Sequence, residues 1–177
     1  MNYANIKCPD IANGLGCRAT LFVSGCEFHC PGCFNAEAWD FKAGKPYTKQ
    51  VENHIMDLLQ PDYIQGLSVL GGEPLNPRNI ATVLSLVKRV RQELPEKDVW
   101  IYTGYRWEML IRFIEHNAAF GQNLGKLLPL VDVLVDGLFV EAKKDISLKF
   151  RGSSNQRLIR CKDSIDNNEN KIILLEL

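Results

Sequence analysis

Three of the six cysteines in this 177-residue chain fall within one short segment, at Cys26, Cys30 and Cys33. Their spacing is C-x3-C-x2-C, and the segment follows directly after an apolar run over residues 19–25 that is typical of a buried strand. Under reducing conditions, cysteines at such short spacing bind a metal or carry out redox chemistry more often than they form disulfides. The sequence therefore predicts a metal-binding loop immediately after a strand.

The number of thiols in this loop indicates the kind of metal site. A structural zinc ion takes four ligands and closes its coordination shell, whereas an iron-sulfur cube bound by three cysteines leaves one iron open to another ligand. Pro31 and Gly32 let the backbone turn tightly without a large side chain in the space of the cube. A zinc site of three cysteines and His29 remains the alternative, but neighbouring side chains in a tight loop point apart, so we expect His29 to be a bystander.

Apolar runs and helical periodicity alternate along the rest of the chain. A helix is predicted from Thr48, its expected N-cap, to the residue before Pro61. The other expected strands cover residues 67–70, 99–102 and 131–135, and the other helices cover 79–94 and 107–116. We expect residues 1–17 to be irregular, residues 117–130 to form mainly a glycine-containing link, and the apolar end of the tail 162–177 to pair as an edge strand or to meet another subunit.

This alternation of strands and helices predicts an α/β fold. Strands that are apolar on both faces favour a mainly parallel sheet with right-handed crossovers. A complete eightfold barrel typically needs about 250 residues, so a chain of 177 residues is too short for one. We therefore expect an open, partial (β/α) barrel that forms a single domain over residues 1–177.

Four unusual motifs each follow one of the predicted strands. They are the cysteine loop 26–33, Gly71-Gly72-Glu73-Pro74, Thr103-Gly104-Tyr105 and Asp136-Gly137. Because the carboxyl ends of parallel strands meet at one edge of a sheet, the four motifs are expected to converge there, where α/β folds bind ligands.

Composition limits the classes of partner. Lys plus Arg and Asp plus Glu both number 21, so the chain has no basic surplus for nucleic acid or an anionic membrane. No 18 apolar residues run together, and the first residues lack a signal-peptide pattern, so we expect a cytoplasmic protein. In that compartment Cys8, Cys17 and Cys161 are expected to be free thiols.

The cysteine loop resembles the cluster motif of the radical S-adenosylmethionine (SAM) enzymes. The wider pattern is similar to the family of anaerobic ribonucleoside-triphosphate reductase-activating proteins, over roughly residues 1–160. The matching stretches are Asn13-Gly14, 20–26, 31–35, Trp39, 71–75, 103–105, 132–137 and 151–156. The position before the last cluster cysteine is usually aromatic in the superfamily and is Gly32 here, as in this smaller family.

The resemblance implies one [4Fe-4S] cluster per chain, with Cys26, Cys30 and Cys33 as ligands and SAM on the fourth iron. Reductive cleavage of SAM would give methionine and a 5′-deoxyadenosyl radical, which would take a hydrogen atom from a glycine of the reductase's large subunit. Reduced flavodoxin is the implied electron donor. An activase of another glycyl-radical enzyme, such as pyruvate formate-lyase, and a non-catalytic zinc-binding module are the alternatives.

The resemblance also implies residues that bind SAM. Backbone groups of Gly32 and Cys33 and the apolar face of Phe34 would contact the adenine, while the turn Gly71-Gly72-Glu73 would accept from the ammonium group. Further candidates for the SAM carboxylate, the ribose or the partner's backbone are Tyr105, Asp136 and Arg151. The stretch 151–157 has turn composition and is equally well interpreted as a loop that docks the partner.

Overall fold

The computed structural model describes residues 1–166 and 171–177. Its strands are β1 (Asn2–Asp10), β2 (Cys17–Val23), β3 (Lys45–Pro46), β4 (Ile64–Gly71), β5 (Asp98–Tyr102), β6 (Val133–Asp136) and β7 (Arg157–Arg160). Its α-helices are α1 (Lys49–Leu59), α2 (Ile80–Glu93), α3 (Trp107–His116), α4 (Ala118–Leu127) and α5 (Cys161–Asp166). Short 3-10 helices cover Ala36–Ala38, Leu128–Leu130 and Glu141–Lys143. No helix in the described part of the chain is both long and apolar enough to cross a membrane.

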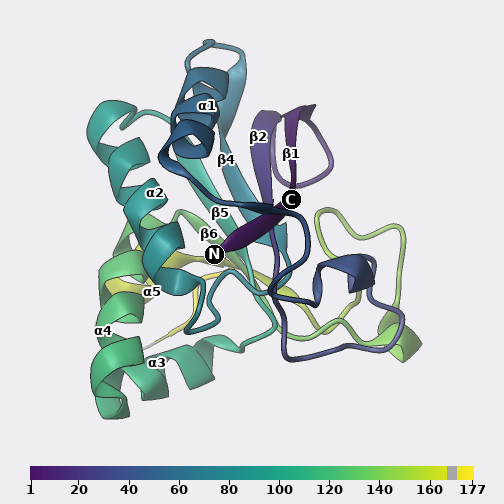
Figure 1. Cartoon of the computed structure of the whole chain (residues 1–177). Helices are drawn as coiled ribbons and strands as arrows, with labels where there is room; N and C mark the ends of the chain where they lie inside the picture. Colours follow the sequence, from purple (N-terminus) through teal and green to yellow (C-terminus); the bar gives the residue numbers. More distant parts are fainter. Residues whose placement is uncertain (167–170) are drawn as a thin grey trace.

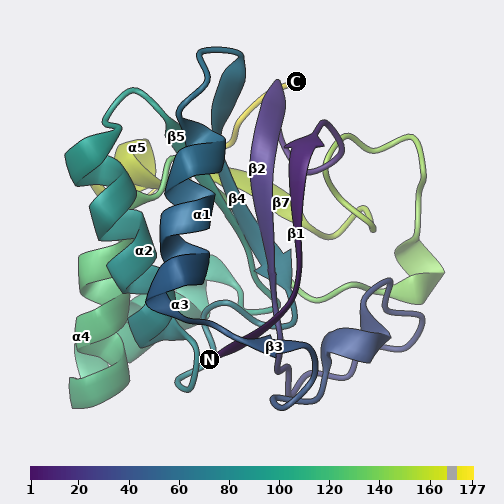
Figure 2. The same cartoon turned by 45° about the horizontal axis from the view of Figure 1, so that its top comes forward.

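The seven described strands form one sheet in the order β3-β1-β2-β4-β5-β6-β7. The four central strands β2, β4, β5 and β6 are parallel, whereas β1, β3 and β7 pair antiparallel at the two edges. Helices α1 to α4 lie on one side of the sheet, and the loops around residues 26–44 and 138–152 lie on the other side (Figures 1 and 2). The predicted α/β class with a mainly parallel sheet is confirmed.

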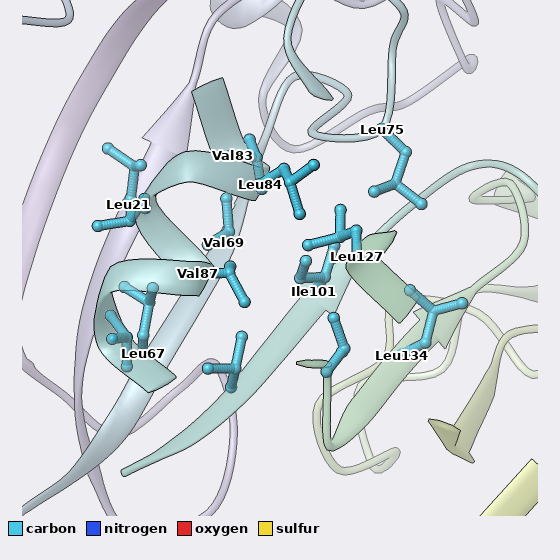
Figure 3. Packing of buried hydrophobic residues seen from close by; sticks show 14 of the residues in the cluster. Leu21, Leu67, Val69, Leu75, Val83, Leu84, Val87, Ile101, Leu127 and Leu134 are labelled. Carbon is cyan, nitrogen blue, oxygen red and sulfur yellow. The ribbon is translucent and has the colours of Figure 1, made fainter. Parts of the chain in front are cut away.

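The core lies between the helices and the parallel strands. Leu67 and Val69 of β4 and Ile101 of β5 project toward Val83 and Val87 of α2, and all five are fully buried (Figure 3). A smaller apolar cluster on the opposite face of the sheet includes Trp100, Val133, Val135 and Leu158. Burial on both faces explains why these strands are continuously apolar in the sequence.

The prediction for the first residues was wrong, because Asn2–Asp10 forms strand β1 beside β2. Its pairing register shifts between Tyr3 and Asn5 and again between Lys7 and Asp10. These irregularities interrupt the alternation of apolar and polar residues that marks a strand in a sequence. For this reason the sequence of β1 lacks the alternating pattern by which a strand is predicted.

The first helix confirms its predicted start, since the Thr48 hydroxyl accepts a hydrogen bond from the Val51 amide at 3.4 Å. Helix α3 has the predicted bounds, and its Ile114 side chain is 37% exposed. The predicted link after α3 is largely helix α4. At Gly121 an added Cβ would lie 2.1 Å from the Phe113 carbonyl oxygen, so this glycine lowers helix propensity but permits close packing on α3.

The last part of the chain covers the β7 edge. Strand β7, which we did not predict, pairs with β6, and Leu174 forms an antiparallel bridge with Ile159. The Leu175 amide also donates to the Leu158 carbonyl at 2.8 Å. The expectation that the apolar end of the tail pairs at a sheet edge is thus confirmed at one bridge, while residues 167–170 of the predicted tail lie outside the described residues.

Candidate metal and cofactor site

The motifs that follow the parallel strands line one cavity of about 540 Å³. Its lining includes the three cysteines after β2, the turn 71–73 after β4, Thr103 and Gly104 after β5, and Gly137 after β6. The sheet contributes Phe22, Leu70 and Tyr102 to the lining, and Asn13 comes from the loop between β1 and β2. The predicted convergence at the carboxyl edge of the sheet is confirmed.

The cysteine loop is held at its base by backbone hydrogen bonds. The Gly25 amide donates to the Ala38 carbonyl at 2.7 Å, and the Cys26 amide donates to the Trp39 carbonyl at 3.0 Å. Within the loop, the Cys33 amide donates to the Cys30 carbonyl at 3.1 Å. The start of the cysteine loop is therefore fastened to residues 38 and 39, which follow it in the chain. The three cysteine side chains line the cavity.

The three thiols face a common cavity without being gathered about one point. All three are free and partly exposed. Within residues 1–166 and 171–177, no three His, Cys, Asp or Glu side chains are close enough together to bind a single metal ion. The Cys33 sulfur accepts a hydrogen bond from the Asn35 amide at 3.4 Å.

Burial affects the protonation of these thiols. It raises the pKa of the Cys26 thiol to about 11 and also raises the pKa of the Cys30 thiol. Both thiols are therefore protonated at neutral pH in the metal-free chain. Because the thiolate is the form that binds metal, any metal that these two residues bind would displace their protons.

Two glycines permit the close approach of neighbouring segments. Gly32 has φ +70°, a conformation that favours glycine, and an added Cβ would lie 2.8 Å from the Glu141 Oε1 atom. An added Cβ at Gly72 would lie 2.6 Å from the Gly25 carbonyl oxygen, which is a backbone atom. The turn after β4 thus packs directly against the base of the cysteine loop.

Glu73 joins three neighbouring segments. The residue is only 2% exposed, and its carboxylate accepts hydrogen bonds from the Thr103 hydroxyl at 2.8 Å, the Gly104 amide at 2.7 Å and the Leu75 amide at 2.9 Å. Its own amide donates to the Gly25 carbonyl at 2.8 Å. Burial raises the pKa of Glu73 to about 7. Of the about four acceptor positions of a carboxylate, three are thus used by donors among the described residues.

The side chain of Phe34 lies at the opening of the cavity. It is 65% exposed, its ring contacts the Phe139 ring with centroids 5.3 Å apart, and the Lys144 Nζ atom lies 5.0 Å from its centroid. His29, which also belongs to this loop, has φ +47° and packs its ring on Trp39 at 4.7 Å.

Of the three further candidates, only Arg151 is among the described residues that line the cavity. Its guanidinium donates to the Gln156 carbonyl at 3.1 Å, and its buried Nε atom has no hydrogen-bond partner among the described residues. Asp136 is buried, and its carboxylate accepts from both Arg157 and the Trp107 amide at 2.8 Å. The structure therefore does not bring Asp136 to the cavity.

Tyr105 also lies away from the lining. Its ring packs edge-on against Phe28 with centroids 4.8 Å apart and contacts Phe113 at 5.8 Å. Burial raises the pKa of its hydroxyl to about 12. Tyr105 thus packs behind Phe28 of the cysteine loop.

Sequence reasoning missed two amide side chains that hold the loops in place. The side-chain amide of Asn79 donates to the Ser24 and Glu73 carbonyls, both at 3.0 Å. It therefore links the turn after β4 to the residues just before the cysteine loop. Gln156 accepts from the Gly152 amide at 2.9 Å and donates to the Gly137 carbonyl at 3.0 Å. Asn79 was interpreted only as the start of a helix, and no spacing rule indicated that its side chain turns back toward the site.

Comparison with known proteins identifies a family. Residues 12–159 match the model of the 4Fe-4S single cluster domain. The chain is 48% identical over 158 residues to the anaerobic ribonucleoside-triphosphate reductase-activating protein of Escherichia coli K12, covering 88% of this chain and 96% of that protein. It is 46% identical to the protein of the same name from Pasteurella multocida, covering 90% and 98%, and 38% identical to that of phage T4, covering 89% and 93%.

Proposed function

Since this chain belongs to the family of anaerobic ribonucleoside-triphosphate reductase-activating proteins, we propose that it activates such a reductase by generating a glycyl radical on its large subunit. The observation that carries this proposal is the cavity at the sheet edge, which brings Cys26, Cys30 and Cys33 together with the turn 71–73. The mainly parallel sheet is, in this proposal, the open partial barrel of the radical SAM type, formed by a single domain.

The residues fit a three-cysteine [4Fe-4S] cluster with SAM. Three free thiols line one cavity, and Gly32 presents backbone without a side chain beside them. When bound, the cluster and SAM supply a one-electron reduction and a 5′-deoxyadenosyl radical that takes a hydrogen atom from a glycine Cα. The protein binds and orients these groups and excludes water from them.

The chain's own residues bind and position SAM. The backbone at Gly71 and Gly72 accepts from the ammonium group together with the fourth acceptor position of Glu73, while Arg151 supplies a cation for the carboxylate. Gly32, Cys33 and Phe34 contact the adenine. Asp136 and Tyr105 act as positioning residues, because Asp136 is paired with Arg157 and Tyr105 packs behind the cysteine loop.

The proposed partners are two proteins. The large subunit of the reductase provides the glycine, and a one-electron donor such as reduced flavodoxin reduces the cluster in the cytoplasm. The balance of 21 basic and 21 acidic residues supports protein partners rather than nucleic acid or a membrane.

Two measurements test the function. The first is iron and sulfide quantification of the anaerobically reconstituted chain, with EPR before and after SAM is added; we expect iron, sulfide and a spectrum changed by SAM. The second uses reductase deuterated at glycine, from which deuterium should appear in 5′-deoxyadenosine. An active mixture without this transfer would exclude direct abstraction.

The same experiments separate the alternatives. A colourless protein that contains zinc and leaves SAM intact after reduction would support a zinc-binding module. Radical formation on pyruvate formate-lyase but not on the reductase would identify another activase. The identity of 48% over 96% of the Escherichia coli K12 protein favours the reductase.

A further inference from the structure

The segment between β6 and β7 forms one wall of the cavity. We name residues 138–152 the strap. Its base is fixed, since the Asn155 amide side chain donates to the Leu138 carbonyl at 2.9 Å and the Ser154 amide donates to the Lys143 carbonyl at 2.9 Å. In both views the strap, drawn in light green, lies beside the dark blue cysteine loop (Figures 1 and 2).

The strap contacts the cysteine loop directly. Phe139 and Lys144 both pack on the ring of Phe34, at 5.3 and 5.0 Å. Glu141 lies next to Gly32, where an added Cβ would be 2.8 Å from its Oε1 atom. The strap and the cysteine loop therefore pack against each other and line the same cavity.

Two large apolar side chains at this opening face solvent. Ile146 is 94% exposed and Phe34 is 65% exposed, yet both line the cavity. Single exposed apolar residues are common on protein surfaces, but apolar residues gathered at the opening of a cavity mark a binding surface. The cavity that contains the three cysteines therefore has an apolar opening.

The strap also carries more basic than acidic side chains. The basic residues are Lys143, Lys144, Lys149 and Arg151, and the acidic residues are Glu141 and Asp145. Lys144 is exposed and lines the cavity, so its charge faces a partner at the opening. An interacting segment with carboxylates beside its apolar part would complement this surface.

We propose that Phe34, Ile146 and the basic strap form the docking surface for the glycine-bearing segment of the reductase's large subunit. This inference rests on the proposed function. Because the reacting hydrogen atom belongs to a polypeptide, a segment of the partner must enter this cavity past its opening. The segment that docks is apolar where it meets Phe34 and Ile146 and acidic where it meets Lys144.

Replacing Ile146 tests the docking surface. The variants are Ile146→Asp, which places a charge on the apolar surface, and Ile146→Ala, which only shortens the side chain. The matched control is Tyr63→Asp, because Tyr63 is 67% exposed but precedes β4 at the opposite edge of the sheet. Binding of each anaerobically reconstituted variant to the purified reductase is measured by biolayer interferometry.

We expect the Kd for the reductase to rise about tenfold in Ile146→Asp and about threefold in Ile146→Ala, and to stay within twofold in Tyr63→Asp. Iron content and Tm of each variant report whether the chain still folds and holds its cluster. A Lys144→Glu variant should raise the Kd more at low salt than at high salt, since salt screens the interaction between surface charges.

Unchanged affinity in Ile146→Asp with full iron content would overturn the docking inference while leaving the proposed function intact. The same holds if Ile146→Asp weakens binding of reduced flavodoxin but not of the reductase. If the wild-type chain forms no glycyl radical on a reductase that it binds, the proposed function fails instead. Radical formation and binding are measured separately, so the two failures are distinguishable.

Discussion

Replacing Gly72 by Ala is expected to separate the turn after β4 from the cysteine loop. The added Cβ would lie 2.6 Å from the Gly25 carbonyl oxygen and 3.0 Å from the Ala38 carbonyl oxygen, whereas ordinary contact begins at 3.4 Å. These neighbours are backbone atoms, so they cannot rotate away as a side chain would. The two segments must therefore move apart by about 0.8 Å, the difference between 3.4 and 2.6 Å.

The cost follows from what this displacement disturbs. Overpacking of a closely packed region costs about 1–3 kcal/mol. Stretching the hydrogen bond from the Glu73 amide to the Gly25 carbonyl, now 2.8 Å long, adds about 1 kcal/mol. We therefore expect Gly72→Ala to lower the free energy of unfolding by about 2–4 kcal/mol, which corresponds to a fall in Tm of about 4–16 °C for a chain of this size.

The assay combines thermal unfolding with iron content after anaerobic reconstitution. The control is Gly125→Ala in α4, where an added Cβ meets only Ile114 Cγ2 at 3.7 Å and where alanine favours the helix by about 0.5–1 kcal/mol. This control should unfold at the wild-type temperature or above it and should bind iron fully. A Gly72→Ala variant with wild-type Tm and full iron content would refute the claim that the two turns require this close contact.

Three further outcomes are expected. Cys26→Ala should bind less iron than the wild type after reconstitution, because Cys26 lines the cavity. Cys8→Ala should bind as much iron as the wild type, because Cys8 does not line it, and iron quantification checks both outcomes. Asp136→Asn should lower the free energy of unfolding by about 1.5–3 kcal/mol, measured in urea, since it removes the charge of the buried partner of Arg157, which keeps its ion pair with Glu108. Burial raises the pKa of Glu73 from 4.5 to about 7, so between these pH values the folded chain holds a proton that the unfolded chain releases; the free energy of unfolding should fall as pH rises through this window. Urea unfolding at several pH values should show that slope in the wild type and a smaller one in Glu73→Gln.

The parallel part of the fold could be predicted because its signals are local. Continuous apolar runs with helices between them gave β2, β4, β5 and β6, and Thr48 gave the start of α1. The edges could not be predicted in this way. Strand β1 has an irregular register beside β2. In α4, Gly121 is required because the Phe113 carbonyl oxygen of α3 occupies the space that a side chain at this position would need.

The location of the site follows from strand order, but the role of each side chain depends on partners that are distant in the sequence. Asp136 follows a parallel strand, as a ligand-binding residue would, yet its carboxylate is bound by Arg157 and by the amide of Trp107. Arg151 is close to Arg157 in the sequence, but it lines the cavity and has a buried Nε atom without a partner among the described residues. Arg157 is the first residue of β7 and pairs with Asp136 at the end of β6. Arg151 comes before β7 and therefore lies outside this strand pair. Which of them is free to bind a ligand is thus decided by the antiparallel pairing of β7, the strand that the sequence did not reveal.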